Sequence, residues 1–357
     1  MSFDLIRVGC FRNLLQTEVV PQPGINIFFG KNASGKSSFL EALYVLGRGK
    51  SFRENHPLNL ISHGMRSFNV YGRKIDDQRR VQIGVEYSRG GFKAHLDGAP
   101  VLRLSQLAEQ TPIQIIAPNT LEIVEKGSMG RRSLIDWGVF HVEHEFGKIS
   151  SRYRRVLSQR NADIRNNVTS RASSIWIPEL VSLGNQIDTA RCRYTDLLKI
   201  RFQQYSKLLG MEQIPSLELF KGWSSKHSLE ESLKLSAEQD KKRGFVSVGP
   251  HRADLLFKDE QGLLKKWGSR GQIKMSLIAL SLAQVDLLFE LRQKRSVLLL
   301  DDLPSELDEE SLANVYAVLC NSKHQVFITT VDKSRFSKLH RGGWFHVEHG
   351  AIAEVCV

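Results

Sequence analysis

The sequence predicts an α/β protein with a mixed sheet, an antiparallel β subdomain and a helical arm. Three observations lead to this class. Short, continuously apolar runs at 25–29, 297–300 and 325–329 are typical of buried parallel strands. Residues 81–87 alternate apolar and polar side chains, as an antiparallel strand with one buried face does. From about residue 145 to 235 the pattern is mainly helical.

The elements around these runs follow in chain order. Phe39, Leu43 and Leu46 recur at helical spacing after the first apolar run, and Gly47 is expected to end that helix. The alternating strand leads into a Gly90-Gly91 turn, which indicates a hairpin. The antiparallel strands are therefore expected to form a subdomain set against the core sheet.

The domain organisation is expected to have three segments. Residues 1–144 are expected to form the first part of an α/β lobe, 145–235 a helical arm, and 236–357 the remainder of the lobe. In the arm, Pro178, Gly184 and Gly210 are expected to interrupt the amphipathic pattern, so one long coiled coil is not expected. A helix that is apolar on most sides, and therefore buried, is expected in the last segment from Lys274 to Leu291.

Composition narrows the class of protein. The 357 residues are 41% hydrophobic and 25% charged, values of a globular chain rather than a disordered or collagen-like one. No apolar stretch reaches the roughly 18 residues of a membrane span, and the first residues do not resemble a secretory signal. The four cysteines are scattered, which argues against a disulfide framework or zinc ribbon. A cytoplasmic protein without a membrane partner is expected, and its net charge of +12 suits a polyanion.

The most specific motif is a phosphate-binding loop. Residues 30–37 read Gly-Lys-Asn-Ala-Ser-Gly-Lys-Ser, which matches G-x-x-x-x-G-K-[ST] at every defined position, between a predicted strand and a predicted helix. Glycines let successive N–H groups turn toward phosphate oxygens, and the helix directs its positive end at them. Lys36 is expected to bridge the β- and γ-phosphates of ATP, and the Ser37 hydroxyl to bind Mg²⁺. The expected cofactor contacts are Gly30, Lys31, Asn32, Ala33, Ser34, Gly35, Lys36 and Ser37.

Two adjacent carboxylates follow the apolar run 297–300. Ligands of parallel sheets bind at the carboxyl ends of the strands, so Asp301 is expected to hold the metal ion directly or through water. Asp302 is expected to orient the attacking water as a catalytic base, with a plain loop residue as the alternative.

A third motif, Ser269-Arg270-Gly271-Gln272, precedes the buried helix. A serine at a helix start followed by glycine presents a hydroxyl and free N–H groups, a second anion site. One chain does not easily bring this site and the phosphate loop to the same phosphate, whereas a symmetric dimer does. Ser269, Gly271 and Gln272 are therefore expected to contact the nucleotide bound by a partner copy.

The order of these motifs resembles the ABC-type ATPases, and more narrowly the RecF family of bacterial recombination and repair ATPases, which is related to the SMC proteins. The segments that carry the narrower resemblance are 10–14, 46–53, 131–138, 159–162 and 249–254. The resemblance implies an ABC-type ATPase head with a helical arm where SMC proteins carry a coiled coil.

The resemblance also implies a function. RecF proteins bind ATP, dimerise around it, bind DNA at gaps or single-strand/double-strand regions, and hydrolyse ATP slowly. With RecR and RecO they help to load RecA and support the SOS response. Two alternatives stay open, namely the ATPase subunit of an ABC transporter and a nucleotide-gated DNA clamp that scarcely hydrolyses ATP. The 233 residues between Lys36 and Ser269 argue against the transporter.

The sequence departs from the ABC pattern at two positions that bear on hydrolysis. Asp302 stands where transporters usually have glutamate, and its shorter side chain fits slow turnover. Residues 330–332, Thr-Val-Asp, stand where a switch histidine is usual. These departures favour a weak, DNA-stimulated ATPase that acts as a switch.

Basic residues gather in three places. They are Arg48, Lys50 and Arg53; Arg131 and Arg132; and Arg152, Arg154, Arg155 and Arg160. Any single one is most simply a solvated side chain, but together with the net charge they favour contact with the DNA phosphate backbone. Aromatic residues make up 8%, so sequence-specific recognition is not expected.

Overall fold

The computed structural model describes residues 2–76, 79–118, 122, 127–166, 171–260, 262–336 and 342–355. The chain forms two compact units. Unit 1 comprises 1–122, 206–211 and 270–357, and unit 2 comprises 123–205 and 212–269. The three segments predicted above, with divisions at 144 and 235, follow the texture of the sequence and stay a prediction.

A six-stranded sheet of unit 1 has the order β15-β14-β3-β13-β12-β8. Every neighbouring pair is parallel except β14 and β15. The predicted apolar runs are β3, β12 and β13, and they lie side by side at the centre, so this prediction is confirmed. The strands are β3 (Ile25–Phe29), β8 (Ile113–Ile116), β12 (Val297–Leu300), β13 (Gln325–Thr330), β14 (Gly343–Glu348) and β15 (Ala351–Glu354).

The second six-stranded sheet of unit 1 is antiparallel, with the order β2-β1-β4-β5-β6-β7. The predicted antiparallel subdomain is confirmed, including the hairpin at Gly90-Gly91 between β5 and β6. Its strands are β1 (Ser2–Phe11), β2 (Leu14–Val19), β4 (Ser67–Asp76), β5 (Arg79–Ser88), β6 (Gly91–Leu96) and β7 (Ala99–Pro100).

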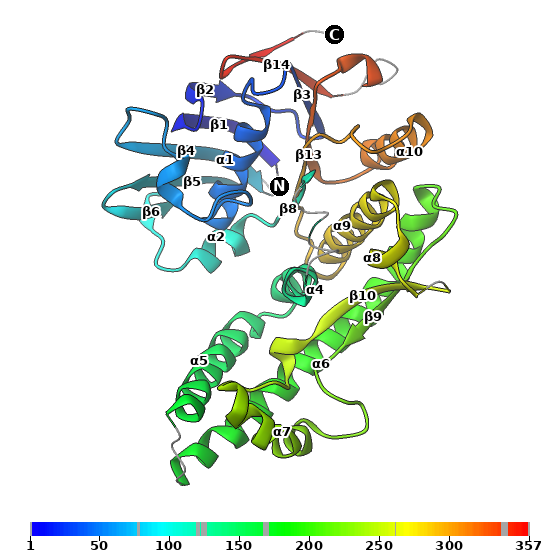
Figure 1. Ribbon diagram of the computed structural model, residues 1–357. Coiled ribbons are helices and arrows are strands. Elements are labelled where there is room, and N and C mark those ends of the chain that lie inside the picture. Colours follow the sequence, from blue (N-terminus) through cyan, green and yellow to red (C-terminus); the bar gives the residue numbers. More distant parts are fainter. Residues whose placement is uncertain are drawn as a thin grey trace. The chain divides into compact units, whose positions relative to one another are not determined.

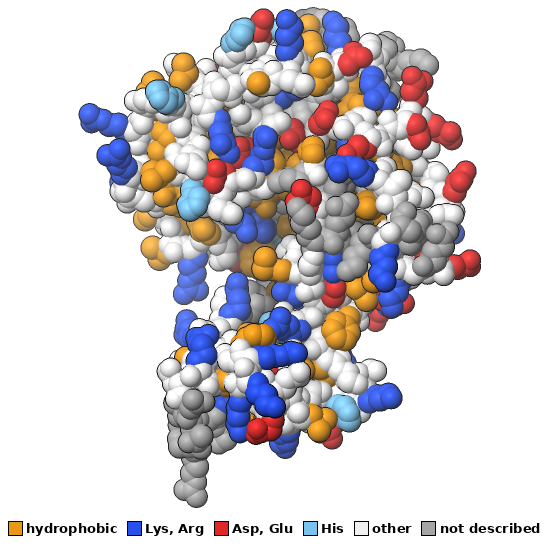
Figure 2. Space-filling view, viewed as in Figure 1, with side chains coloured by type: hydrophobic (Ala, Val, Ile, Leu, Met, Phe, Trp, Pro, Cys, Tyr) orange, Lys and Arg blue, Asp and Glu red, His pale blue; other side chains and the backbone are white. Residues whose placement is uncertain are grey.

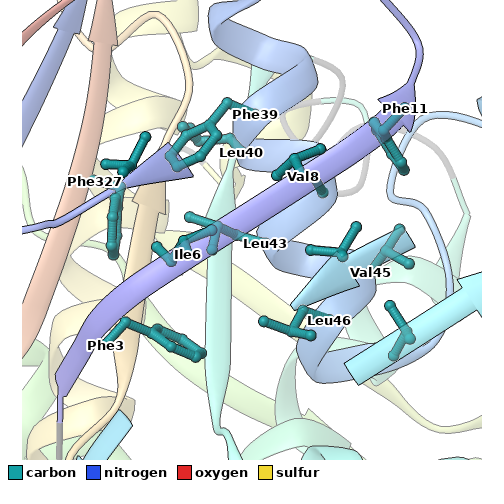
Figure 3. Packing of buried hydrophobic residues seen from close by; sticks show 14 of the residues in the cluster. Phe3, Ile6, Val8, Phe11, Phe39, Leu40, Leu43, Val45, Leu46 and Phe327 are labelled. Atoms are coloured by element: carbon teal, nitrogen blue, oxygen red, sulfur yellow. The ribbon is translucent and has the colours of Figure 1, made fainter. Parts of the chain in front are cut away.

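Helix α1 (Lys36–Arg48) packs against strands of both sheets (Figure 1). Phe39, Leu40 and Leu43 project from it into a cluster of fully buried side chains that includes Ile6 of β1 and Phe327 of β13 (Figure 3). The core of unit 1 thus lies between the two sheets and is filled from one helix.

Gly47 does not end α1, so that prediction is wrong. The helix runs on to Arg48, and Gly49 caps it in the left-handed conformation with φ of 66°. Gly47 lies inside the last turn because the helix passes close to β8 there. A Cβ at this position would lie 2.5 Å from Cδ1 of Ile113.

Unit 1 contains further helices, one of which is buried. The predicted buried helix is confirmed as α9 (Arg270–Arg292), longer at its start than expected. Contrary to the expectation that no apolar stretch reaches the length of a membrane span, this helix is long and apolar enough by length and composition, but 83% of its most apolar window is buried, as in a core helix. The remaining helices of this unit are α2 (Leu104–Gln110), α10 (Glu309–Cys320) and the 3-10 helices η1 (Pro57–Leu60) and η3 (Lys333–Phe336).

Unit 2 is mainly helical and contains a small antiparallel sheet of order β11-β10-β9 that the sequence did not predict. Short strands separated by helices give little periodic signal. Its elements are α4 (Ser128–Val142), α5 (Phe146–Arg165), most of α6 (Arg171–Leu208), β9 (Ser216–Phe220), α7 (Leu229–Arg243), η2 (Pro250–Arg252), β10 (Asp254–Asp259), β11 (Gly262–Leu263) and α8 (Leu264–Trp267).

At Pro178 and Gly184 the helix is not interrupted, because α6 continues through both residues, but it ends at Leu208, before Gly210. Gly184 instead serves close packing inside unit 2. A Cβ there would lie 2.4 Å from Cδ2 of Leu229, at the start of α7. A glycine that lets a neighbouring helix approach looks the same in a sequence as one that ends a helix.

We expect Phe39→Ala to lower the free energy of unfolding by about 4 kcal/mol, because it removes a fully buried ring and leaves a cavity between the sheets. Urea denaturation followed by circular dichroism measures this. Leu15→Ala in β2, where the side chain is 59% exposed, should change stability by less than about 0.5 kcal/mol. Equal effects of the two substitutions would contradict the placement of the core.

Candidate functional site

The loop of residues 30–37 joins β3 to α1, so the strand and helix that the motif requires are both present. Gly30 and Gly35 have φ of 152° and 121°, conformations that side chains disfavour. At Gly30 a Cβ would also lie 2.2 Å from the carbonyl oxygen of Val347 in β14. The backbone and packing therefore both require glycine at this position.

Two polar side chains of the loop are buried, Lys36 and Ser34. The Lys36 ammonium donates to the carbonyl oxygens of Gly30 and Lys31, each at 2.7 Å. Burial lowers the pKa of Lys36, while the carboxylates of Asp301 and Asp302 act in the opposite direction. The Ser34 hydroxyl is buried and has no hydrogen-bond partner among the described residues. These observations fit a loop built to surround an anion.

Asp301 joins the loop to the ends of the two central strands. One of its carboxylate oxygens, Oδ1, accepts from the Ser37 hydroxyl at 2.8 Å and from the Thr329 hydroxyl at 2.7 Å. The structure thus brings together Ser37 and Asp301, the two residues predicted to bind metal. Hydroxyl and carboxylate oxygens are suitable ligands for Mg²⁺.

Thr329 was missed by the sequence analysis. Its hydroxyl donates to the Asp301 carboxylate and accepts from the backbone N–H of Asp302 at 2.7 Å, so it orients the first carboxylate and fixes the backbone at the second. The only sequence signal is a polar residue near the carboxyl end of the apolar strand β13. That position is next to the end of β12 because the two strands pair in register.

Asp302 lies in a left-handed conformation, with φ of 51°. Its carboxylate accepts no hydrogen bond from any described residue. This placement is compatible with the predicted role as base, which the geometry alone does not test.

Two cations hold the loop that follows β12. The Lys274 ammonium of α9 donates to the carbonyl oxygens of Asp302 and Ser305, at 2.9 and 2.7 Å. From η3, Arg335 donates to the carbonyl oxygens of Pro304 and Leu307, both at 3.0 Å. Burial lowers the pKa of Lys274. The sequence signal for Lys274 is a lysine within an otherwise apolar helix.

The third motif, Ser269-Arg270-Gly271-Gln272, lies at the start of α9. Ser269 is exposed and directly precedes the helix, which begins at Arg270, and Gly271 and Gln272 form its first turn. Arg270 forms an ion pair with Glu306 of the loop after β12. Ser269 thus stands at the expected helix start, and its contact with a nucleotide stays a prediction.

The predicted basic clusters differ in how available they are. Arg131 is buried and forms a bidentate ion pair with Asp254 at 2.7–2.8 Å, so it is not free to contact DNA. On α5, Arg152 pairs with Glu179, whereas Arg154 and Arg155 are exposed and have no acidic partner among the described residues. In the face shown, the part of unit 2 that holds α5 and α7 displays more Lys and Arg than Asp and Glu (Figure 2).

Three features define the class of protein. A phosphate-binding loop follows β3, two carboxylates follow β12, and a second, antiparallel sheet belongs to the same unit. This is the arrangement of an ABC-type ATPase head of the SMC kind. The family model described as the RecF/RecN/SMC N-terminal domain matches residues 3–351. The chain belongs to the RecF family.

Relatives match over almost the whole chain. The protein named DNA replication and repair protein RecF from Pseudoalteromonas translucida (strain TAC 125) is 35% identical over 99% of both chains. The protein of the same name from Shewanella frigidimarina (strain NCIMB 400) is 34% identical over 99% of this chain and 100% of its own.

Solved structures agree with this assignment. One of the recombination mediator protein RecF–ATP in the RecFOR pathway has a TM-score of 0.87 and 25% identity, and covers 99% of this chain and 98% of its own. The Smc head domain from Pyrococcus furiosus, solved with the C-terminal domain of ScpA, has a TM-score of 0.62 at 14% identity and covers 100% of this chain and 96% of its own. The second likeness concerns the fold alone.

We expect Lys274→Met to loosen the loop after β12, because the carbonyl oxygens of Asp302 and Ser305 would lose a charged donor. Hydrogen exchange followed by mass spectrometry should show faster exchange in residues 302–308, with a loss of about 2–3 kcal/mol in local stability. Lys234→Met on the exposed side of α7 is the matched control. Unchanged exchange in the loop would show that Lys274 does not hold it.

Proposed function

We propose that this protein binds ATP with Mg²⁺ in the loop 30–37. Lys36 exchanges its two carbonyl acceptors for the β- and γ-phosphates, and Ser37 and Asp301 hold the metal ion. The observation that carries this proposal is the inward-facing Lys36 and Ser34 beside the Ser37–Asp301 contact. The solved RecF–ATP structure, similar over 99% of this chain, supports the choice of nucleotide.

ATP then joins two copies of the chain. Ser269, Gly271 and Gln272 of one copy close on the phosphates held by the other, since the positive end of a helix dipole attracts anions. Arg270 and Glu306 connect this helix start to the loop after β12, which carries Asp302. Nucleotide state and dimerisation are therefore coupled through residues of one loop.

Hydrolysis is slow and acts as a switch. Asp302 is the general base, and its short side chain limits how well it positions water. Residues 330–332 contain no histidine that could contact the γ-phosphate. The Thr330 hydroxyl in this segment donates to the carbonyl oxygen of Asp332. This contact also favours the second candidate function, a nucleotide-gated clamp that scarcely hydrolyses ATP.

The ATP-bound form binds DNA without sequence preference, at gaps or single-strand/double-strand regions, in recombinational repair and the SOS response. The supports are the net charge of +12, the exposed Arg154 and Arg155, which have no acidic partner in the described part of the chain, and relatives named for DNA replication and repair. Partners of the RecO and RecR type, acting with RecA, follow from the RecFOR pathway named for the solved relative. The transporter alternative has no support among these relatives.

Three substitutions separate the steps. Lys36→Ala should abolish ATP binding and the ATP-dependent dimer. In contrast, Ser269→Asp should keep ATP bound but place a like charge against the partner's phosphates and prevent dimerisation. Asp302→Asn should keep ATP binding and the ATP-dependent dimer, while the rate of ATP hydrolysis falls at least about a hundredfold. ATP binding is measured with a fluorescent ATP analogue at equilibrium, dimerisation by analytical ultracentrifugation, and hydrolysis by phosphate release. An ATP-dependent dimer of Ser269→Asp would refute the shared site.

DNA affinity should fall about a hundredfold between 50 and 200 mM salt if about four phosphates are contacted. Arg155→Gln should reduce the slope of log K against log[salt] by about one, because its side chain is exposed and unpaired. Arg152→Gln, which removes an arginine already paired with Glu179, is the control and should alter the slope less. Fluorescence anisotropy measures both, and affinity independent of salt would contradict the proposal.

A further inference from the structure

A row of aromatic side chains crosses the antiparallel sheet of unit 1. Phe68 of β4, Tyr87 of β5 and Phe92 of β6 are cross-strand partners in direct register. The Phe68 and Tyr87 rings are stacked, with centroids 6.1 Å apart and planes at 18°. Phe11 and Phe68 are fully buried, whereas Tyr87 and Phe92 are partly exposed, so the row leads out of the core to the surface.

A cavity of about 170 Å³ lies at the exposed end of this row. Tyr87 and Phe92 contribute its apolar lining, and Lys50, Ser51 and Asn55 lie on its polar side, in the segment after α1. The volume is below the ~300 Å³ at which pockets for drug-sized ligands begin. It suits a single planar ring system rather than a whole nucleotide.

The segment that covers the cavity is held in place by a buried carboxylate. Glu41 of α1 is completely buried and accepts from both Nε and Nη2 of Arg12, at 3.0 and 2.9 Å, and from the Ser51 hydroxyl. The Ser51 oxygen in turn accepts from the backbone N–H groups of Arg53 and Glu54, at 2.8 and 2.9 Å. The cavity is therefore preorganised in the protein without a ligand.

Two polar side chains of the cavity are available. The Lys50 ammonium and the Asn55 amide have no side-chain partner among the described residues. Burial, with Arg48 nearby, lowers the pKa of Lys50. The Glu54 carboxylate is already occupied, because it accepts from the backbone N–H of His56 and from the Asn59 amide.

We infer that this cavity receives one unpaired base of a DNA strand, packed against the rings of Tyr87 and Phe92, with Lys50 beside the carbonyl edge of the base. The inference rests on the proposed DNA binding and specifies how single-stranded regions are distinguished from duplex. Every base offers an aromatic face, so such a site recognises the unpaired state without reading the sequence. An amide both donates and accepts, so Asn55 tolerates different base edges.

The experiment uses the full chain and a single-stranded oligonucleotide with one 2-aminopurine, whose fluorescence is quenched when it stacks. Wild-type protein should quench the probe and bind it about tenfold more tightly than an oligonucleotide of abasic sites. Tyr87→Leu and Phe92→Leu should each lose the quenching and most of that tenfold difference. Affinity for blunt duplex DNA should stay within about twofold.

Matched controls lie on the same sheet. Tyr71 of β4 is three positions from Phe68 and therefore on the opposite face, and its hydroxyl donates to Gln82, so Tyr71→Leu should keep the quenching. Lys93 is the neighbour of Phe92 in β6 and therefore lies on the opposite face of the sheet. Lys93→Gln removes a charge from that face and should also keep the quenching. Lys50→Gln, on the rim and outside the core, should lower the preference for bases over abasic DNA about threefold, even if the aromatic variants fold poorly.

The outcomes separate the two proposals. Equal affinity of wild-type protein for normal and abasic strands, with duplex binding intact, overturns this inference and leaves the proposed function standing. Displacement of the probe by adenosine alone overturns the assignment of the cavity to DNA. Absence of any DNA binding by wild-type protein overturns the proposed function together with the inference.

Discussion

The candidate site depends on one carboxylate oxygen, Oδ1 of Asp301, which accepts two hydroxyl hydrogens at once. The parallel register explains why both donors reach it. Leu300 of β12 pairs with Ile328 of β13, so the next residue of each strand, Asp301 and Thr329, emerges at the same edge of the sheet. Ser37 approaches from α1, which follows the adjacent strand β3. A buried carboxylate needs such donors, since burial without hydrogen bonds is costly.

The loop beyond Asp301 is held through its backbone. Asp302 and Glu306 both have positive φ, which costs conformational energy for residues other than glycine. Lys274 and Arg335 offset this cost by donating to four carbonyl oxygens of the loop. Cations of α9 and η3 therefore hold the backbone of the loop, and the ion pair of Glu306 with Arg270 adds one side-chain contact.

The fold was predictable from the sequence where a pattern of residues is compatible with one kind of local structure. Continuous apolar runs have few uses other than buried parallel strands, and the glycines of the phosphate loop are required by backbone angle and close packing. The predictions failed where a residue has several uses. Gly47 and Gly184 let neighbouring elements approach instead of ending helices.

The same distinction applies to the candidate site. Ser37 and Asp301 were predicted from motif spacing, and the structure brings them into contact. Thr329 reaches Asp301 because of the register between β12 and β13, and Lys274 binds backbone carbonyl oxygens. A local sequence pattern predicts neither contact. Arg131 looked like a surface cation, but its partner Asp254 lies 123 residues further along the chain.

The order of strands in the parallel sheet has a consequence for biosynthesis. β3 and β8 are made early, yet they are separated in the sheet by β13 and β12, which come from residues 297–330. A nascent chain therefore carries two strands with unpaired edges until the ribosome has made most of the polypeptide, and such edges invite aggregation. Early contact with chaperones and rapid proteolysis of prematurely terminated chains are the expected costs of this topology.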